Sequence, residues 1–222
     1  MLNYAGFFEK GASPLLRTVA LGTLAVPTGR LYCCDPFLSH EVAPLDVRVK
    51  PGDHAVDLCL AKMSGWGERV ALARLCLSTA PVVSWREAGY SLDGEPCSGF
   101  RVDAGMACFM DEAARTVFAQ AVAAWHAKGP DTNYYDDVLA ALFKQNADPA
   151  NPYHAGDWAI HTPAPGAHEN LALFASGLGD GVYEAHWGVD AAGQPAMLVA
   201  DFGLLPLAPD EDEDTHASPE SH

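Results

Sequence analysis

The chain has 222 residues, 49% of them hydrophobic, and carries 13 Lys and Arg against 29 Asp and Glu, a formal net charge of −16. Because a chain of this length and composition can bury one sizeable core, we expect a single globular domain over residues 1–208. The charge argues against direct nucleic-acid binding, which depends on cationic side chains, and it favours a basic protein as partner, since opposite net charges speed encounter.

Both ends of the chain bear on its location. The run at 209–222 is rich in like charges and has almost no apolar residues, so it is predicted to be a disordered acidic tail. The N-terminal segment has no basic region followed by a clean apolar stretch, and the nearest candidate span is interrupted by Arg17. We therefore expect a soluble cytoplasmic protein with no membrane partner.

The first half of the chain shows the period-two pattern of β-strands. In the segment at 54–63, Val56, Leu58 and Leu60 alternate with residues of the opposite face. Pro27-Thr28-Gly29 and the segment at 50–53 have turn composition. Strands are predicted at 17–26, 30–35, 45–49, 54–63, 69–77 and 80–87.

The middle of the chain changes to a helical period. Asp111 is a suitable N-cap for a helix over 112–128, whose apolar stripe includes Phe118 and Trp125, and Gly129-Pro130 ends it. A second helix is predicted over 133–145 and a short strand over 157–161.

The last third returns to strands at 170–176, 182–188 and 195–203, joined by short turn-rich connections. Short connections favour antiparallel neighbours and hence a C-terminal β-meander. The predicted fold class is α+β: a mainly antiparallel, sandwich-like β-sheet with two helices in the middle of the chain.

The segment Gly179–Gly203 concentrates candidate functional residues. Asp180 lies between glycines and is accounted for by a tight turn. Tyr183 and Trp187 share one strand face, which indicates core positions. Asp201 follows an apolar run, so it needs either a partner or a solvent-facing place at the strand end.

A second candidate stretch is Asp103-Ala104-Gly105, directly after a predicted strand. A carboxylate at a strand end followed by glycine can be presented to a substrate or cation. The stretch is superficially similar to the Asp-Thr/Ser-Gly of aspartic proteases, but that chemistry needs two such carboxylates and the chain has one. Asp103, Asp180 and Asp201 would form an acidic pocket if they met at one sheet edge.

The sequence contains no motif for a metal site, a catalytic nucleophile or a phosphate-binding loop. The nine histidines are scattered without metal-ligand spacing, and the six cysteines lack CxxC and are predicted to be reduced core thiols. There is no nucleophile elbow and no phosphate-binding loop. We expect no metal and no cofactor.

Four ordered stretches carry a resemblance to a known family. They are LAVPTGRLYCCDP, RVALARLCLSTAPVVSW, VDAGMACFMD and GDGVYEAHWGVDAAGQPAMLVADFG. Over roughly residues 15–206 the chain resembles an uncharacterised bacterial family, the domain of unknown function numbered 4241. The resemblance implies one conserved architecture and suggests that the Asp103 and Asp180 stretches belong together, but it implies no catalytic role.

Three functional hypotheses follow from the sequence. The first is a non-catalytic protein-binding domain, one version being an immunity-type protein that captures a basic toxin. The alternative is a hydrolase or cation-binding enzyme that uses Asp103 with Asp180 or Asp201. A purely structural or oligomerising domain is a third interpretation. The candidate functional cluster comprises Asp103, Gly105, Asp180, Tyr183, Trp187 and Asp201.

Overall fold

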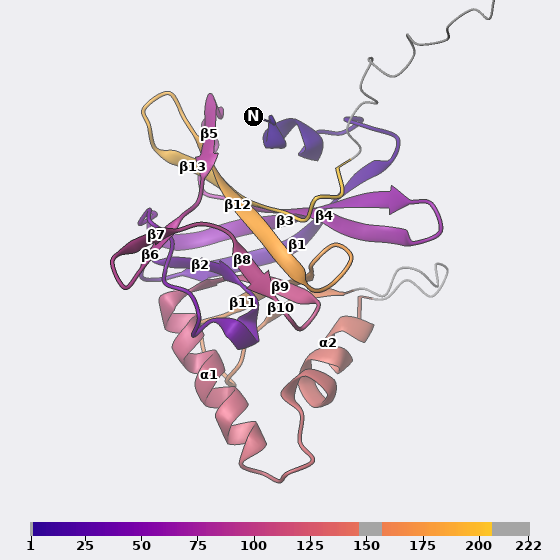
Figure 1. Cartoon of the computed structure of the whole chain (residues 1–222), viewed down its shortest axis with the longest axis vertical. Coiled ribbons are helices and arrows are strands. Elements are labelled where there is room, and N and C mark those ends of the chain that lie inside the picture. Colours follow the sequence, from indigo (N-terminus) through magenta and orange to yellow (C-terminus); the bar gives the residue numbers. More distant parts are fainter. Residues whose placement is uncertain (1, 147–156, 206–222) are drawn as a thin grey trace, which may run out of the picture.

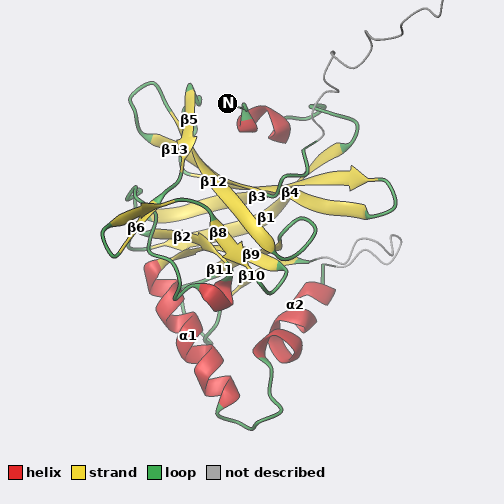
Figure 2. Cartoon of the chain, viewed as in Figure 1, coloured by secondary structure: helices red, strands yellow, loops and turns green. Residues whose placement is uncertain are grey.

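The computed structural model describes residues 2–146 and 157–205, so the predicted acidic tail lies outside the described residues. Two antiparallel sheets lie face to face, and the two helices lie beyond the smaller sheet (Figure 1; Figure 2). This arrangement confirms the predicted α+β class with a sandwich-like sheet and two helices in mid-chain.

The larger sheet is antiparallel throughout and has seven strands. Its order is β1 (Leu16–Val26), β3 (Gly52–Met63), β4 (Gly67–Cys76), β13 (Pro195–Asp201), β12 (Gly181–Val189) and β5 (Ser84–Glu87). β8 (Phe100–Val102) pairs with the first residues of β12. β12 is therefore shared between two partners along one side, β8 at its start and β5 at its end.

The smaller sheet has the order β10 (Trp158–His161), β11 (Leu171–Ala175), β9 (Met106–Asp111) and β2 (Leu31–Cys34). A separate two-stranded ribbon joins β6 (Tyr90–Leu92) to β7 (Glu95–Cys97). The segment predicted as a strand at 45–49 forms only isolated bridges at Leu45 and Arg48. The segment does not join a ladder, so its strand-like alternation of apolar residues did not predict a strand of either sheet.

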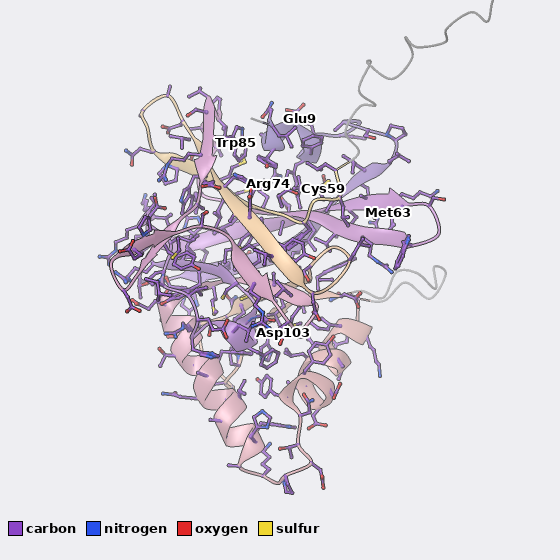
Figure 3. All side chains as sticks on the ribbon, in the orientation of Figure 1. Glu9, Cys59, Met63, Arg74, Trp85 and Asp103 are labelled. Carbon is purple, nitrogen blue, oxygen red and sulfur yellow. The ribbon has the colours of Figure 1, made fainter. Side chains whose placement is uncertain are left out.

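The main core lies between the two sheets and includes Trp187 from β12 and Phe109 from β9, both fully buried. The alternation of β3 places Val56, Leu58 and Leu60 in this core, as predicted. Cys59, on the opposite face of β3, is also fully buried, because the 3₁₀ helix η1 (Tyr4–Phe8) covers that face. Figure 3 shows Cys59 and Arg74 near this N-terminal cover and Asp103 on the side of the helices.

The C-terminal strands differ from a continuous meander in one respect. β12 and β13 form an antiparallel hairpin, as predicted, but β11 pairs with β9 and β10 in the smaller sheet. The chain thus crosses between sheets at 176–180. Gly177 takes a φ of 60°, and a Cβ there would lie 2.9 Å from the Cβ of Phe202, so the crossing needs glycine.

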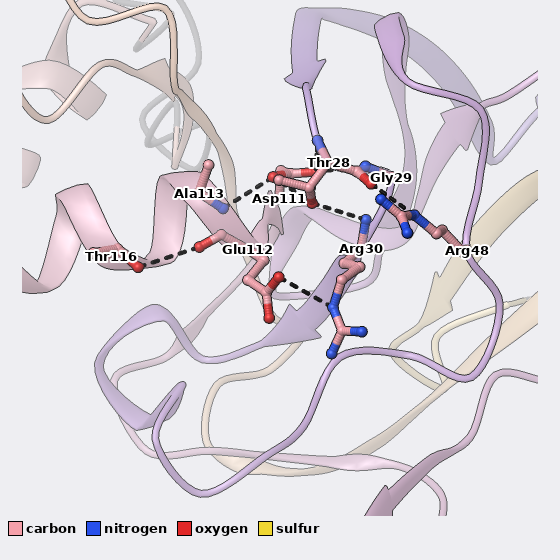
Figure 4. A network of polar contacts seen from close by, with 8 residues as sticks. All are labelled: Thr28, Gly29, Arg30, Arg48, Asp111, Glu112, Ala113 and Thr116. Carbon is pink, nitrogen blue, oxygen red and sulfur yellow. Dashed lines mark hydrogen bonds and ion pairs between the residues drawn. The ribbon is translucent and has the colours of Figure 1, made fainter.

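Helix α1 (Glu112–His126) begins at the residue predicted from the sequence. The Asp111 carboxylate is fully buried and accepts a hydrogen bond from the N–H of Ala113, the N-cap geometry. It also accepts from the Thr28 hydroxyl and from the N–H groups of Thr28 and Gly29, so one carboxylate ties the predicted turn at 27–29 to the helix (Figure 4). The segment at 27–29 forms a bend between β1 and β2, and it contributes to the start of the helix.

The second predicted helix is present over most of 133–145, but its first part is not α-helical. A π-helical turn, η3 (Tyr135–Leu139), continues into α2 (Ala140–Lys144). A further 3₁₀ turn, η2 (Pro36–Leu38), follows β2. Among the described residues, no helix has the length and apolar character required to cross a membrane.

Candidate functional site

The loop that carries Asp103 is organised by a buried carboxylate at the end of β2. Asp35 is fully buried, and its Oδ2 accepts hydrogen bonds from the N–H groups of Asp103 (3.0 Å) and Ala104 (2.9 Å). Its Oδ1 accepts from the N–H of Phe37 at 2.8 Å and caps η2. Because three backbone donors share this carboxylate, both of its oxygens have hydrogen-bond partners without a cationic side chain among the described residues.

The next N–H of the same loop reaches across to the other predicted stretch. The N–H of Gly105 donates to Oδ1 of Asp180 at 2.9 Å, and the Gly105 carbonyl accepts from the N–H of Ser176 at 3.1 Å. Gly105 has a φ of 63°, which glycine adopts at little cost. β8 and β12 pair directly beside this contact, with Val102 opposite Gly181. The Asp103 and Asp180 stretches therefore meet in space.

The two aromatic residues of the predicted cluster have structural places. The Tyr183 hydroxyl lies 2.7 Å from the Gly179 carbonyl and 3.0 Å from that of Ser176, to which it donates, closing the turn before β12. Burial raises the pKa of Tyr183, against the opposing effect of the Ser176 hydrogen bond. Trp187 is fully buried, and its indole N–H donates to Asp46 at 2.8 Å. Both side chains serve packing and turn geometry.

Asp201 lines a different hollow from Asp103. It is paired across the ladder with Glu184, and its Oδ1 accepts from the N–H of Gly203 at 2.9 Å. It lines a shallow hollow of about 280 Å³ that shares no lining residue with the hollow beside Asp103. Burial, followed by the Asp201 carboxylate, raises the pKa of Tyr4, so the phenol of the N-terminal cover stays protonated beside it.

The hollow beside Asp103 is an open cleft of about 560 Å³, within the range of ligand-binding pockets. It lies where the loop at 103–104, η2 and the connection between α1 and η3 come together. We call it the acidic cleft; it is lined by Asp35, Phe37, Leu38, Asp103, Ala104, His126, Asn133, Tyr134, Tyr135 and Asp136.

The chemistry of the acidic cleft combines carboxylates with aromatic rings. Asp103 and Asp136 are exposed and present their charge, whereas Asp35 is consumed by backbone donors. No Lys or Arg is among the lining residues. Arg101 stands outside the lining and pairs with Asp103 at 3.0 Å, with both side chains more than half exposed, so water screens this pair strongly. Such a surface suits a cationic group with an apolar or planar body.

Several residues of the cleft were not candidates from the sequence. Asp35 ends a fully apolar strand and precedes a proline, a position at which a carboxylate needs backbone donors, and that signal could have marked it. Tyr134 and Asp136 carry no comparable signal, because only the fold brings the connection between helices next to the loop after β8.

Metal and thiol chemistry find little support in the geometry. Within residues 2–146 and 157–205, no group of three or more His, Cys, Asp or Glu side chains is placed to hold a metal ion. Cys34 faces Cys108 across the β2–β9 ladder, and both are buried free thiols. Burial, followed by the Cys34 thiol, raises the pKa of Cys108 well above its usual range, which leaves it a poor nucleophile.

Comparison with known proteins gives one match. A protein-family model described as "Protein of unknown function (DUF4241)" matches residues 24–200. That range includes the strands of both sheets from β2 onward except the last residue of β13, both helices and the whole lining of the acidic cleft. No curated protein and no solved structure matches the chain.

Proposed function

Since the chain belongs to this family of proteins of unknown function (DUF4241), whose description assigns no activity, we propose a function from the geometry of the chain itself. It is a non-catalytic binding domain for a basic protein, and an Arg or Lys side chain of that partner docks in the acidic cleft. The observation that carries the proposal is that exposed Asp103 and Asp136 line the same cleft as Tyr134 and Tyr135.

Charge on two scales supports this proposal. The whole chain has a formal net charge of −16, which attracts a basic protein over distance and accelerates encounter. In contact, two carboxylates beside aromatic rings match a guanidinium, which can pair in its plane and stack on a ring face. An immunity-type protein that captures a basic toxin is one version that fits both features.

The alternative of an acid/base enzyme receives less support. Asp180 bonds to the N–H of Gly105, and Asp201 lies in a different hollow, so the three aspartates are not presented to one substrate. Catalysis by a carboxylate pair requires both groups at the same reacting bond. The arrangement therefore favours binding through Asp103 over chemistry through the predicted cluster.

The test compares two variants of equal charge. Asp103→Asn with Asp136→Asn removes two charges from the acidic cleft, and Asp53→Asn with Glu95→Gln removes two exposed charges elsewhere. Each protein, together with the wild type, is immobilised and exposed to a lysate of the source cells in rising KCl, and captured proteins are identified by mass spectrometry.

We expect the wild type and the control variant to retain the same basic protein, and the cleft variant to lose it. With the purified partner, the cleft variant should bind roughly 10- to 100-fold more weakly, as for the loss of charged interface contacts. Equal capture by both variants would contradict a role for the cleft. Hydrolytic activity that Asp103→Asn abolishes without lowering Tm would favour the enzyme.

A further inference from the structure

A second cavity lies on the other side of Tyr134 and differs from the acidic cleft in chemistry. It has a volume of about 620 Å³ and lies between α1, η3 and the segment that follows β10. Its wall is mainly apolar, formed by alanines and prolines together with Trp125 and Val138. Tyr134 is the one lining residue that the two cavities share.

The polar groups of this cavity are few. Tyr134 and His161 are both more than nine-tenths buried, and the Tyr134 hydroxyl lies 2.9 Å from Nε2 of His161. Thr162 and Lys128 are exposed at the mouth. No Asp or Glu is among the lining residues, which is unusual in a chain with 29 of them. Lys128 is the only charged side chain of the lining.

The hydrogen bond between Tyr134 and His161 leaves one N–H donor of the pair without a partner in the described part of the chain. Among the described residues, His161 Nε2 is the only partner of the Tyr134 hydroxyl, so the phenol satisfies its proton by donating to that nitrogen. Burial lowers the pKa of His161 to about 4, so the ring is neutral at physiological pH. Its remaining proton then lies on Nδ1, which has no hydrogen-bond partner among the described residues. Because His161 lines the cavity, this N–H is available to an acceptor on a bound ligand.

Trp125 is held in place at the wall. Its indole N–H donates to Asp137 at 2.8 Å, and Lys128 lies over its ring with Nζ 3.3 Å from the centroid. Asp137 also accepts from the N–H of Asn133 at 2.9 Å, which anchors it. The Lys128 ammonium is thereby positioned beside the aromatic wall. The Asp137 carboxylate neutralises the charge of Lys128 only in part, because both groups are exposed to water.

From these observations we propose that this cavity is a binding site for a small planar aromatic carboxylate. The apolar wall takes the ring, and the polar groups of the lining can supply donors: His161 Nδ1–H, the Thr162 hydroxyl and the Lys128 ammonium. A carboxylate supplies the acceptors that these donors need, together with the charge that complements Lys128. The site is separate from the acidic cleft and does not depend on capture of a basic protein.

The experiment uses three probes of one shape on the full chain. Naphthalene-2-carboxylate, naphthalene-2-methanol and 2-naphthylmethylammonium share the ring and differ in charge, and their affinities are measured by isothermal titration calorimetry. We expect the carboxylate to bind roughly 10-fold or more tightly than the alcohol, and the ammonium more weakly than either.

Three variants test whether the probes bind in this cavity. Lys128→Met should reduce the affinity for the carboxylate to about that for the alcohol, whereas Lys144→Met, at the end of α2 and outside the lining, should leave both unchanged. Ala124→Trp fills the cavity from an exposed wall position and should abolish binding of both probes while its circular dichroism and Tm match the wild type.

Equal affinity for the carboxylate and the ammonium would overturn the proposal, as would carboxylate binding that survives in a folded Ala124→Trp protein. Absence of saturable binding of any of the three probes at millimolar concentration would overturn it too. None of these results bears on the acidic cleft, whose test uses different residues and a protein partner.

Discussion

The His161–Tyr134 pair shows how one buried side chain makes the protein sensitive to acid. His161 lies at the end of β10, beneath α1, with 7% of its surface exposed. Phe118 and Tyr134 pack edge-on against its ring. An imidazolium in this apolar setting loses its hydration, which is why the pKa falls from 6.5 to about 4.

This depressed pKa predicts the direction of the pH dependence of stability. In the unfolded chain His161 takes up a proton near pH 6.5, whereas in the folded chain it does so only near pH 4. Between these values the unfolded state binds more protons, so the free energy of unfolding decreases as pH falls, by up to about 3 kcal/mol from this residue. The measurement is urea unfolding at pH 7 and pH 4.5.

The variant His161→Gln can still accept from Tyr134 but does not titrate, so its loss of stability between the two pH values should be smaller than that of the wild type. His40→Gln removes an exposed histidine and should retain the full wild-type loss. Identical pH profiles for all three proteins would show that protonation of His161 is not a source of acid sensitivity.

At the scale of single elements, the start of α1 depends on more than its N-cap. Asp111 joins β9, the helix and the turn before β2, and Arg48 adds a hydrogen bond from its Nε to the Thr28 carbonyl at 3.0 Å. Arg30 and Glu112 form an ion pair at 3.1 Å on the exposed side of the same junction. The buried carboxylate and the exposed pair should therefore differ greatly in their contributions.

We expect Asp111→Asn to lower the free energy of unfolding by about 2–4 kcal/mol. The amide keeps the shape, but its NH₂ group faces backbone donors and cannot accept from them. Glu112→Gln, which breaks only the exposed ion pair, should cost no more than about 0.5 kcal/mol. Chemical denaturation of the two variants gives the comparison, and similar losses would mean that the network around Thr28 contributes little.

The same elements show what could be inferred from the sequence. Asp111, the apolar stripe with Phe118 and the alternation of Val56, Leu58 and Leu60 predicted α1 and β3 because their signals are local. β2 and β11 were predicted as strands, but their partners were not, since pairing depends on segments far away in the chain. The short link at 176–180 favoured a hairpin, and its glycines instead carry the chain between sheets.

At the scale of the whole molecule, excess negative charge opposes compactness. With a formal net charge of −16, the carboxylates repel one another more in the folded chain than in the unfolded chain. Ion pairs such as Arg17–Glu68 and Arg74–Asp57 offset only part of this repulsion. Screening by salt should therefore stabilise the fold.

Raising KCl from 20 to 300 mM shortens the screening length to below about 10 Å. We expect a stabilisation of the order of 1 kcal/mol, which corresponds to a rise in Tm of roughly 2–4 °C for a domain of this size. Differential scanning calorimetry measures it, and the Asp53→Asn, Glu95→Gln protein should show a smaller rise. A Tm that falls with salt would mean that the ion pairs outweigh the repulsion.

The site shows the same division between local and distant information. Asp103 and Gly105 were candidates because the motif is contiguous, and the structure places Gly105 of this stretch against Asp180, as the family resemblance suggested. Asp35, Tyr134 and His161 were not, because their neighbours come from other elements. Asp201 was grouped with Asp103 because both were predicted at strand ends, and it lines a different hollow.

Three consecutive N–H groups, those of Asp103, Ala104 and Gly105, are shared between two carboxylates: Asp35, which follows a strand of the smaller sheet, and Asp180, which precedes one of the larger. Asp35 precedes the loop in the chain and is already synthesised when the loop emerges, whereas Asp180 follows the loop and leaves the ribosome later. The first two amides can therefore be satisfied before the C-terminal hairpin exists, and the third cannot. Folding of the sandwich then ends with a long-range step that must wait for the last strands, and such non-local closure is slow.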